Sequence, residues 1–463
     1  MSMTLKPFQP KPQTSVHFEA SVKRKVLNEA GCPGGVSEAF DDVVILGGAR
    51  TPFAKIGGSF RQVPAYELLL TAMKGAVEKT GVNPADINQV MVGNIISSST
   101  QAGFYPRNLT ADLGVPEGTI AHKSDRLCGT GFELVRQAAN QLTDGGDSVI
   151  ITGGVENMSQ TPVMDTDRML MEEFAKGQME KGGIKGKVIG WMLKRKLGKA
   201  KPYTNPLNEG LTDPKADIMI GTADKLAKMK GLTREQADAF AAESQKRAKA
   251  AVDGGRVKEE IRPVRQTDLQ KGKLPKGVTE VTKDEHLRET NAQKLGKLKT
   301  IMTNKEDAIH TAGSSSGIVD GAAAIVVSTG AMAKSKNLPI LAKLKAVAVT
   351  GCDPKIMGFG PARAIPAALE AAGVKMEDVS YVEVNEAFAG QALAVQKALN
   401  IPDSKFNPDG GAIAFGHPLS ATGGRITLHA AHRLKQDNAK YAVVSACIGG
   451  GQGIAMVLEN PEA

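Results

Sequence analysis

The feature that most constrains the fold of this chain is an internal repeat, in which residues 292 positions apart match along a long stretch. The matched segments are 80–82 with 372–374, 86–87 with 378–379, 90–92 with 382–384, 130–131 with 422–423, 138–139 with 430–431, and 142 with 434. One offset maintained over this distance is hard to obtain by chance. The repeat therefore predicts two copies of the same folding unit.

Within each copy, short apolar runs alternate with amphipathic helical patterns. The predicted strands are Gln89–Gly93, 148–152, 381–384 and 441–445, and the predicted helices are 131–142 and 424–434. Short β-rich strands joined by helices are typical of mostly parallel sheets with both faces covered. We therefore predict an α/β fold made of two similar units.

The segment from 158 to 305 has no counterpart in the repeat, and we interpret it as an inserted loop domain. Long insertions on a rigid scaffold often lie over a functional site. Within it, Thr233 and Gln236 form the pattern of a capping box, which predicts the start of a helix over Arg234–Asp253. The expected division is an extension at 1–40, a first half at 41–157 plus 306–332, the loop domain at 158–305, and a second half at 333–463.

The net charge of +9 is concentrated in one segment. Residues 176–202 contain nine Lys or Arg residues and one acidic residue, and the rest of the chain is nearly neutral. Such a segment can face the phosphates of a small ligand or an anionic membrane surface. Because only 4% of the residues are aromatic and the charge is confined to this segment, we expect no nucleic-acid partner.

Cysteine and histidine spacing argues against a metal site or a disulfide framework. The four cysteines form no CxxC pair, and no cysteine or carboxylate accompanies His429 and His432 in sequence. No run reaches the roughly 18–20 apolar residues of a membrane span, and the N-terminus lacks a secretory core. We therefore expect no metal and a reducing compartment, either a bacterial cytoplasm or an organelle matrix, without secretion.

Two residues with nucleophile or base chemistry precede predicted helices. Cys128 stands just before the helix at 131–142, where free N–H groups and the positive end of the helix dipole lower a thiol pKa. This position favours a thiolate nucleophile, although a small buried hydrophobic cysteine is an equal alternative. His417 lies between glycines and Pro418 in a tight turn before another helix, where it is either a catalytic base or a capping residue.

Further polar residues stand at the ends of predicted strands. Cys447 ends a buried strand and enters a glycine run at 449–451, whose backbone N–H groups form an oxyanion hole or simply a tight turn. Asn385 and Glu386 follow the repeated strand at its carboxyl end, where open α/β sheets place their ligands. Two cysteines, a histidine and an asparagine at such places favour one catalytic centre over four coincidences.

The order and spacing of these residues resemble the thiolase family, from about Asp42 to the C-terminus. The motifs that carry the resemblance are RLCGTG at 126–131, GTAD at 221–224, IRPV at 261–264, DGAAA at 320–324, NEAF at 385–388, GHP at 416–418 and CIGGGQG at 447–453. The resemblance implies thiolase half-folds in duplicated α/β/α/β/α layers with a loop domain, assembled as a homodimer or homotetramer. It also implies CoA thioesters as ligands, with coenzyme A as a substrate and no permanently bound cofactor.

Carried onto this sequence, the resemblance implies a role for each candidate residue. Cys128 would carry the acyl group as a thioester, and His417 would deprotonate Cys128. His417 and a water held by Asn385 would stabilise the enolate of the departing acetyl-CoA. Cys447 would be the general acid and base, and the N–H groups of Cys128 and Gly449 would bind the oxyanion of the acylated intermediate.

The resemblance also implies contacts with CoA and with the acyl chain. The implied contacts are Ser316 with the pantetheine of CoA, Arg288 with its adenine-ribose end, and Met219 and Ile220 with the acyl chain. Two positions depart from the family pattern, because Thr130 stands where serine is usual and Ser314 where asparagine is common. Both changes are small and polar, so we expect activity to be retained.

The family pattern leaves residues 1–40 and a basic insert at 166–202 unexplained. In the insert, Ile184, Val188 and Met192 recur every four residues between lysines, which is typical of a basic amphipathic helix. Similar inserts occur in thiolase subunits of fatty-acid oxidation complexes, where they contact a membrane or a partner. We hypothesise such membrane or β-oxidation partner docking for this insert. The alternative is packing on the loop domain and attraction of CoA phosphates.

Three functions are consistent with these residues. The first, which we expect, is a degradative thiolase that cleaves 3-ketoacyl-CoA with CoA in fatty-acid β-oxidation. The second is a condensing enzyme, either a biosynthetic acetoacetyl-CoA thiolase or a relative of the ketoacyl synthases, which resemble this fold but lack the cysteine at Cys447. The third is a catalytically silent acyl-CoA carrier or scaffold, against which the intact set of Cys128, Asn385, His417 and Cys447 argues.

Overall fold

The central element of the computed structural model is a twelve-stranded sheet that runs through both halves of the chain. The structure describes residues 22–27, 35–99, 101–145, 148–161, 188, 190, 212–302 and 306–463. The basic insert at 166–202 lies almost wholly outside these residues, so its docking role stays a prediction. In the part of the chain that is described, no helix combines the length and the apolar character needed to cross a membrane.

In the first half, four strands share one direction and a fifth runs against them. Their spatial order is β3 (Val43–Arg50), β10 (Val319–Thr329), β7 (Val149–Glu156), β5 (Gln89–Gly93) and β6 (Ile120–Lys123). β10 is the antiparallel strand between β3 and β7, and β4 (Ala54–Lys55) pairs with its first residues. β5 pairs in parallel with both β6 and β7. β6 therefore ends the sheet as an edge strand next to the Cys128 segment.

The second half repeats this arrangement, again with one strand antiparallel to its neighbours. Its strands are β11 (Ala342–Gly351), β14 (Gln452–Glu459), β13 (Tyr441–Ile448) and β12 (Val379–Val384). β14 runs antiparallel to β11 and β13, whereas β12 and β13 are parallel. The two halves join where β11 pairs with β3, at Ala342 opposite Ile45 and Lys343 opposite Val44. Further along the same edge of β11, β2 (Gly35–Phe40) pairs with it and with β1 (Val22–Leu27).

The repeat found in the sequence is confirmed element by element. The same offset of 292 residues relates β7 to β13 at both ends, since Val149–Glu156 maps onto Tyr441–Ile448. The helices α1 (Ala65–Thr80) and α11 (Gly360–Ala372) also correspond. Each ends at a glycine in the left-handed conformation, Gly81 with φ 67° and Gly373 with φ 66°, which glycine adopts without the steric cost of a Cβ. The predicted α/β fold of two similar units is therefore confirmed.

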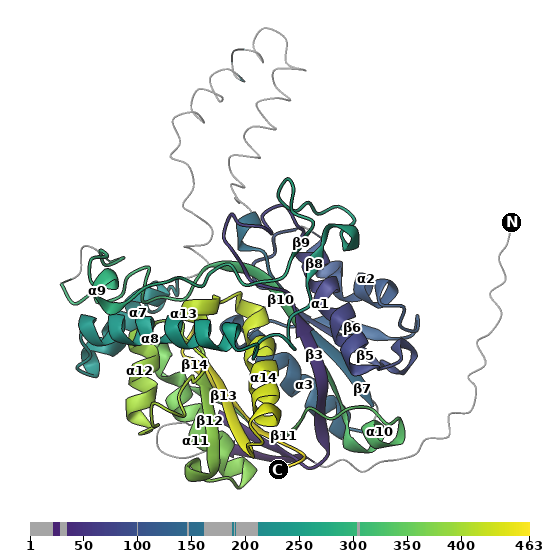
Figure 1. Ribbon diagram of the computed structural model, residues 1–463. Coiled ribbons are helices and arrows are strands. Elements are labelled where there is room, and N and C mark those ends of the chain that lie inside the picture. The colour runs from purple at the N-terminus through teal and green to yellow at the C-terminus, as the bar shows by residue number, and fades with distance from the viewer. Residues whose placement is uncertain are drawn as a thin grey trace, which may run out of the picture.

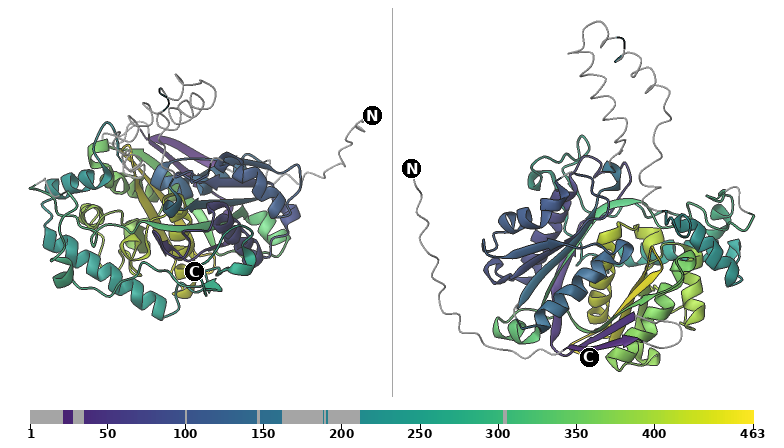
Figure 2. Two further views of the ribbon diagram at one scale, coloured as in Figure 1. Left: turned by 90° about the horizontal axis from the view of Figure 1, so that it is seen from above. Right: turned by 180° about the vertical axis from the view of Figure 1, so that it is seen from behind.

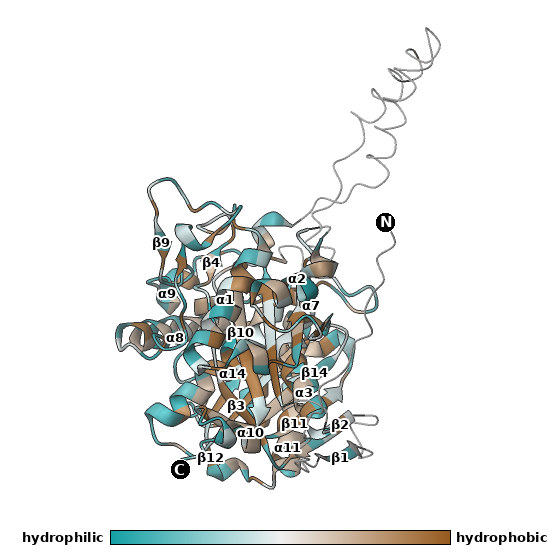
Figure 3. Cartoon of the chain, turned by 90° about the vertical axis from the view of Figure 1, so that its right-hand side faces the viewer, coloured by the Kyte–Doolittle hydropathy of each residue, from teal (hydrophilic) through white to brown (hydrophobic). Residues whose placement is uncertain are grey.

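Helices form three layers around the two halves of the sheet (Figures 1 and 2). The central layer is α3 (Thr130–Thr143) with α14 (Leu419–Gln436), whose apolar side chains share one core cluster with strands of both halves. α1 and α2 (Tyr105–Asp112) pack on the outer face of the first half. α11 and α12 (Ala389–Ala398) pack on that of the second. Figure 3 shows the apolar strands enclosed by these helices, which is the expected α/β/α/β/α layering.

The remaining elements connect the halves or lie over them. The short helices are α10 (Gly330–Ser335) and α13 (Ala412–Phe415), and 3₁₀ turns occur at Pro84–Asp86, Ala102–Phe104, Leu127–Gly129, Met158–Gln160, Gln266–Asp268, Pro354–Phe359 and Met376–Asp378. The loop region holds α7 (Met219–Met229), α8 (Arg234–Asp253), α9 (Ala292–Leu295) and the pair β8 (Val264–Arg265) and β9 (Glu280–Val281). The predicted capping box of α8 is present, with bonds of 3.2 and 3.3 Å between Thr233 and Gln236.

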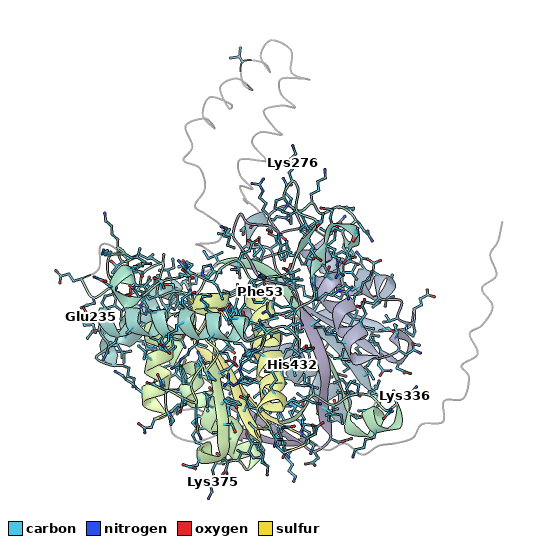
Figure 4. The ribbon with its side chains drawn as sticks, in the orientation of Figure 1. Phe53, Glu235, Lys276, Lys336, Lys375 and His432 are labelled. Atoms are coloured by element: carbon cyan, nitrogen blue, oxygen red, sulfur yellow. The ribbon has the colours of Figure 1, made fainter. Side chains whose placement is uncertain are left out.

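Buried ion pairs attach this loop region to the sheet. Arg50, at the end of β3, donates to both carboxylate oxygens of Asp284, at 2.7 and 2.9 Å, and to Glu260 at 3.3 Å. Its guanidinium lies 5.1 Å from the ring centroid of Phe53, which is labelled within the molecule in Figure 4. Glu260 also pairs with His429 of α14 at 3.4 Å. Burial opposes a charge on His429, but the surrounding carboxylates raise its pKa to about 10.

Candidate active site

Cys128 sits in a tightly fixed 3₁₀ turn between β6 and α3. Leu127 has a positive φ of 45°, a rare conformation for a residue with a side chain. Thr130 closes the turn, because its Oγ1 accepts a hydrogen bond from Arg126 N and donates one to Leu127 O, both 2.8 Å long. A Cβ on Gly129 would lie 2.5 Å from Ile448 Cδ1. The turn is therefore packed directly against the end of β13.

The Cys128 thiol is protonated at rest. It packs against an apolar cluster around Met158 and Leu419. Burial raises its pKa to about 11, and the negative charge of Glu156 adds to this effect, whereas a hydrogen bond from Gly449 N to the sulfur lowers the pKa by less. The expectation that the helix start lowers this pKa is wrong, because burial outweighs the helix end. The thiol therefore needs a base before it can act as a nucleophile.

His417 is a buried neutral imidazole. It follows Gly416, whose φ of 96° and close approach to Val319 leave no room for a side chain. Its backbone N–H donates to Gly317 O at 2.9 Å. Burial, followed by the positive charge of Arg425, lowers the pKa of His417 to about 4. At neutral pH the ring therefore keeps one unprotonated nitrogen and can accept a proton.

Asn385 stands beside His417 at the carboxyl end of β12. Its Nδ2 lies 3.3 Å from His417 Nε2, and its buried Oδ1 has no hydrogen-bond partner among the residues that the structure describes. An unpaired buried acceptor next to the imidazole is suited to hold a water or a substrate group. The neighbouring Glu386 points elsewhere, since its carboxylate accepts from Ser244 Oγ at 2.7 Å and Asn407 Nδ2 at 2.9 Å. Glu386 thus supports the loop and does not face the imidazole.

Cys447 is fully buried at the end of β13, opposite Gly453 of β14. It packs with Met357 and Ala387. Its pKa lies well above the ordinary value, first because of burial and then because a charge on Cys128 opposes a second thiolate. The chain turns after it through Gly450 and Gly451, with φ of 80° and 83°. A charge on Cys128 therefore disfavours a charge on Cys447, and both thiols are neutral at rest.

Of the four predicted substrate contacts, Ser316, Met219 and Ile220 lie on segments next to this centre, and Arg288 lies in the loop region. Ser316 is half-buried and its N–H donates to Ala387 O at 3.0 Å, so it is tied to the Asn385 loop. Met219, at the start of α7, packs with the Cys447 cluster, and Ile220 beside it is buried. Arg288 is exposed, and its Nη2 lies 3.1 Å from His286 Nε2. Arg288 also lines a cavity of about 670 Å³ in the loop region.

The structure adds functional candidates that the sequence reasoning missed. Thr422 Oγ1 lies 2.6 Å from His417 Nδ1, and Glu156 lies near Cys128 with hydrogen bonds from Ile95 N and Ile96 N, both 2.9 Å. Thr422 is the repeat partner of Thr130, which was the one signal available for it. Nothing in the sequence singled out Glu156, because its partners come from segments far away along the chain. In the described residues, no group of three or more His, Cys, Asp or Glu side chains is arranged to hold a metal ion.

Comparison with known proteins gives consistent matches over both halves. Residues 43–331 match the family model "Thiolase, N-terminal domain" and residues 338–460 match "Thiolase, C-terminal domain". The chain is 38% identical over 420 residues to mitochondrial 3-ketoacyl-CoA thiolase of Mus musculus, covering 90% of this chain and 98% of that protein. It is 36% identical over 419 residues to acetyl-CoA acetyltransferase of Pseudomonas aeruginosa, covering 90% and 99%.

Solved structures agree with the sequence matches. The crystal structure of human mitochondrial 3-ketoacyl-CoA thiolase superposes with a TM-score of 0.79 at 36% identity, covering 91% of this chain and 99% of that one. The same human protein in complex with CoA gives a TM-score of 0.78 at 36% identity, covering 90% and 98%. Similarity of this extent, over sequence and fold together, means that the chain belongs to the thiolase family and is an acyltransferase.

Proposed function

We propose that this protein is a degradative thiolase, which cleaves a 3-ketoacyl-CoA with CoA to acetyl-CoA and an acyl-CoA shortened by two carbons. The observation that carries the proposal is the neutral His417 imidazole held by Asn385, in a centre that also contains two protonated thiols. Acyl transfer through a thioester needs a nucleophile, a base for it, and a second proton carrier. Cys128, His417 and Cys447 match these three needs.

In the first half-reaction, His417 takes the proton of Cys128 and the thiolate attacks the 3-oxo carbon of the substrate. The N–H groups of Cys128 and Gly449 receive the oxyanion, and Gly449 N already donates to the Cys128 sulfur. Cleavage of the bond between C2 and C3 leaves the acyl group on Cys128. The electron pair stays on the acetyl-CoA carbanion, which Cys447 protonates. His417 and a water on Asn385 Oδ1 stabilise its enolate form.

In the second half-reaction, the Cys447 thiolate takes the proton of an incoming CoA thiol. The resulting CoA thiolate attacks the thioester carbon, the bond to Cys128 breaks, and the acyl group leaves as the shortened acyl-CoA. The Cys128 thiolate takes back the proton held by His417, which restores both cysteines and the neutral imidazole. Coenzyme A is thus a substrate, and the proposal needs no permanently bound cofactor. Ser316 and Arg288 are the proposed contacts of CoA, and Met219 and Ile220 those of the acyl chain. The half-buried Ser316 and the exposed Arg288 suit a ligand that enters from solvent.

We also propose that the protein assembles as a homodimer or homotetramer through β6. This edge strand carries Ile120, which is 60% exposed, and the nearby Phe104 is 68% exposed. Leu127, next to the nucleophile, is 37% exposed. An unpaired edge with large apolar side chains is a natural pairing surface for a second copy. By likeness to mitochondrial and bacterial relatives, we propose a bacterial cytoplasm or an organelle matrix as its compartment.

A biosynthetic acetoacetyl-CoA thiolase, which condenses two acetyl-CoA molecules, is the second candidate. The similar identities to 3-ketoacyl-CoA thiolase (38%) and to acetyl-CoA acetyltransferase (36%) support both. The two candidates use the same residues in opposite directions and differ in the acyl chain that they accept. Acyl-chain selectivity is therefore the property to measure.

The test is CoA-dependent cleavage of 3-ketoacyl-CoAs from four to sixteen carbons. Cys128→Ser is compared with Cys352→Ser, a control at a partly exposed cysteine that neighbours Cys447 and takes no part in the proposed steps. Activity that rises with chain length, is abolished in Cys128→Ser and persists in Cys352→Ser supports the degradative proposal. Activity confined to acetoacetyl-CoA favours the biosynthetic candidate, and activity retained by Cys128→Ser overturns the thioester route.

A further inference from the structure

Thr422 is hydrogen-bonded to the imidazole that the proposed mechanism uses as its base. Its Oγ1 lies 2.6 Å from His417 Nδ1 and 3.2 Å from Pro418 O. On the other side of the ring, Asn385 Nδ2 lies 3.3 Å from Nε2. All three residues Thr422, His417 and Asn385 are buried. The ring is therefore held at both nitrogens by neutral side chains.

The chemistry of these groups allows one order of donors and acceptors. The Asn385 amide nitrogen can only donate, so Nε2 must accept. The single proton of the neutral ring then sits on Nδ1 and is donated to Thr422 Oγ1. The hydroxyl, having accepted, donates its own proton to Pro418 O. In this arrangement the Asn385, His417 and Thr422 protons each make one hydrogen bond. Nε2 is the ring nitrogen that carries the lone pair.

The internal repeat shows what is particular to Thr422. Its counterpart Thr130 also lies in the first turn of a central helix, where it accepts from Arg126 N and donates to Leu127 O. In the first half the hydroxyl fixes the backbone turn that bears Cys128. In the second half the hydroxyl accepts from a ring nitrogen instead of a backbone N–H. The two equivalent threonines thus hold the proposed nucleophile and the proposed base.

We infer that Thr422 is a positioning residue that fixes the tautomer of His417, so that Nε2 is the nitrogen that accepts the proton of Cys128. The inference rests on the proposed function of His417. Without the hydroxyl, the buried Nδ1–H has no acceptor, and the ring moves its proton to Nε2 or rotates. Either change removes the lone pair from the side that carries Asn385. The base is then lost although the nucleophile is intact.

The inference is tested by the rate at which iodoacetamide alkylates Cys128 in the full chain, followed by peptide mass spectrometry from pH 6 to pH 10. The variants are Thr422→Val, which keeps the shape, and Thr422→Ser, which restores the hydroxyl. Thr427→Val is the matched control, since Thr427 lies on the same helix, is fully buried and has an Oγ1 without a hydrogen-bond partner in the described part of the chain. The charged groups that act on the pair are Arg425 on His417, and Glu156 and Asp125 on Cys128. None of these is changed.

At pH 7 we expect Thr422→Val to be alkylated about tenfold more slowly than the unmodified protein, because base assistance is lost. The difference should narrow toward pH 10, where the thiolate begins to form without a base. Thr422→Ser and Thr427→Val should stay within about twofold of the unmodified protein. An equal loss at every pH would mean a merely structural role and would overturn the inference.

His417→Ala separates failure of this inference from failure of the proposed function. If His417→Ala slows alkylation at pH 7 and Thr422→Val does not, His417 acts as the base without help from Thr422, and only the inference falls. If His417→Ala leaves the rate unchanged, the pairing of His417 with Cys128 is wrong, and both fall. If Cys128 is alkylated slowly at pH 7 in Thr422→Val and also in His417→Ala, the inference and the proposed function are both supported.

Discussion

Replacing Arg50 by methionine should destabilise the protein strongly, because it leaves two buried carboxylates without their cation. Arg50 is fully buried, with a bidentate bond to Asp284 and a bond to Glu260. Methionine fills a similar volume but donates no hydrogen bond. Removing one member of such a buried ion pair costs about 3–5 kcal/mol, far more than the contact itself is worth in water.

The matched control is Lys336→Met, which breaks the half-exposed pair between Lys336 and Asp86 at 3.1 Å. Pairs at the surface contribute about 0–1 kcal/mol, because water and salt screen them. Urea unfolding followed by circular dichroism measures both variants against the unmodified protein. A free energy of unfolding that falls by about 3–5 kcal/mol in Arg50→Met and by under about 1 kcal/mol in Lys336→Met is the expected result.

The same substitution should also weaken CoA binding. Asp284 is held by Arg50 and accepts from Phe53 N at 2.7 Å, and it begins the segment that carries Arg288. Arg288 meets His286, whose ring packs on Gly317 beside the proposed pantetheine contact. We therefore expect KM for CoA to rise in Arg50→Met with a smaller change in kcat. Equal free energies of unfolding for Arg50→Met and Lys336→Met, together with an unchanged KM for CoA in Arg50→Met, would refute the reasoning.

Three further predictions concern other parts of the molecule. Because the pKa of His417 is lowered to about 4, the neutral base persists in mild acid, and kcat/KM should fall only as the pH approaches 4; a loss centred near pH 6.5 would contradict this. Gly154→Ala should abolish soluble protein, since its Cβ would collide with Ser420 O, whereas Gly103→Ala, in open space, should be tolerated. Ile120→Lys should shift the species seen by analytical ultracentrifugation toward monomer; an unchanged distribution would exclude β6 as the interface.

Local patterns in the sequence predicted much of the fold. The strand Gln89–Gly93 has the predicted bounds, and the helix predicted at 131–142 spans Thr130–Thr143. Such elements were predictable because apolar periodicity and capping residues act within a few positions. The pairing of β11 with β2 and β3 could not be predicted in this way, since it depends on contacts between segments that are distant in the sequence.

The candidate site was predictable in its residue types and not in its electrostatics. The sequence placed Cys128 at a helix start and so suggested a low thiol pKa, whereas burial raises that pKa to about 11. Burial is a property of the packed molecule, and Glu156 contributes through a contact that no spacing rule reveals. Thr422 lies five residues from His417, but its bond to Nδ1 depends on how the turn after Gly416 folds.

The proposed mechanism is tested most directly by trapping the acyl group. The unmodified protein is mixed with acetoacetyl-CoA in the absence of free CoA, quenched with acid, and digested for peptide mass spectrometry. We predict an acetyl group on the peptide that contains Cys128, persisting because no CoA thiol is present to accept it. The modification should be absent in His417→Ala at the same reaction time. An acyl group on another residue, or turnover with no acylated Cys128, would contradict the thioester route.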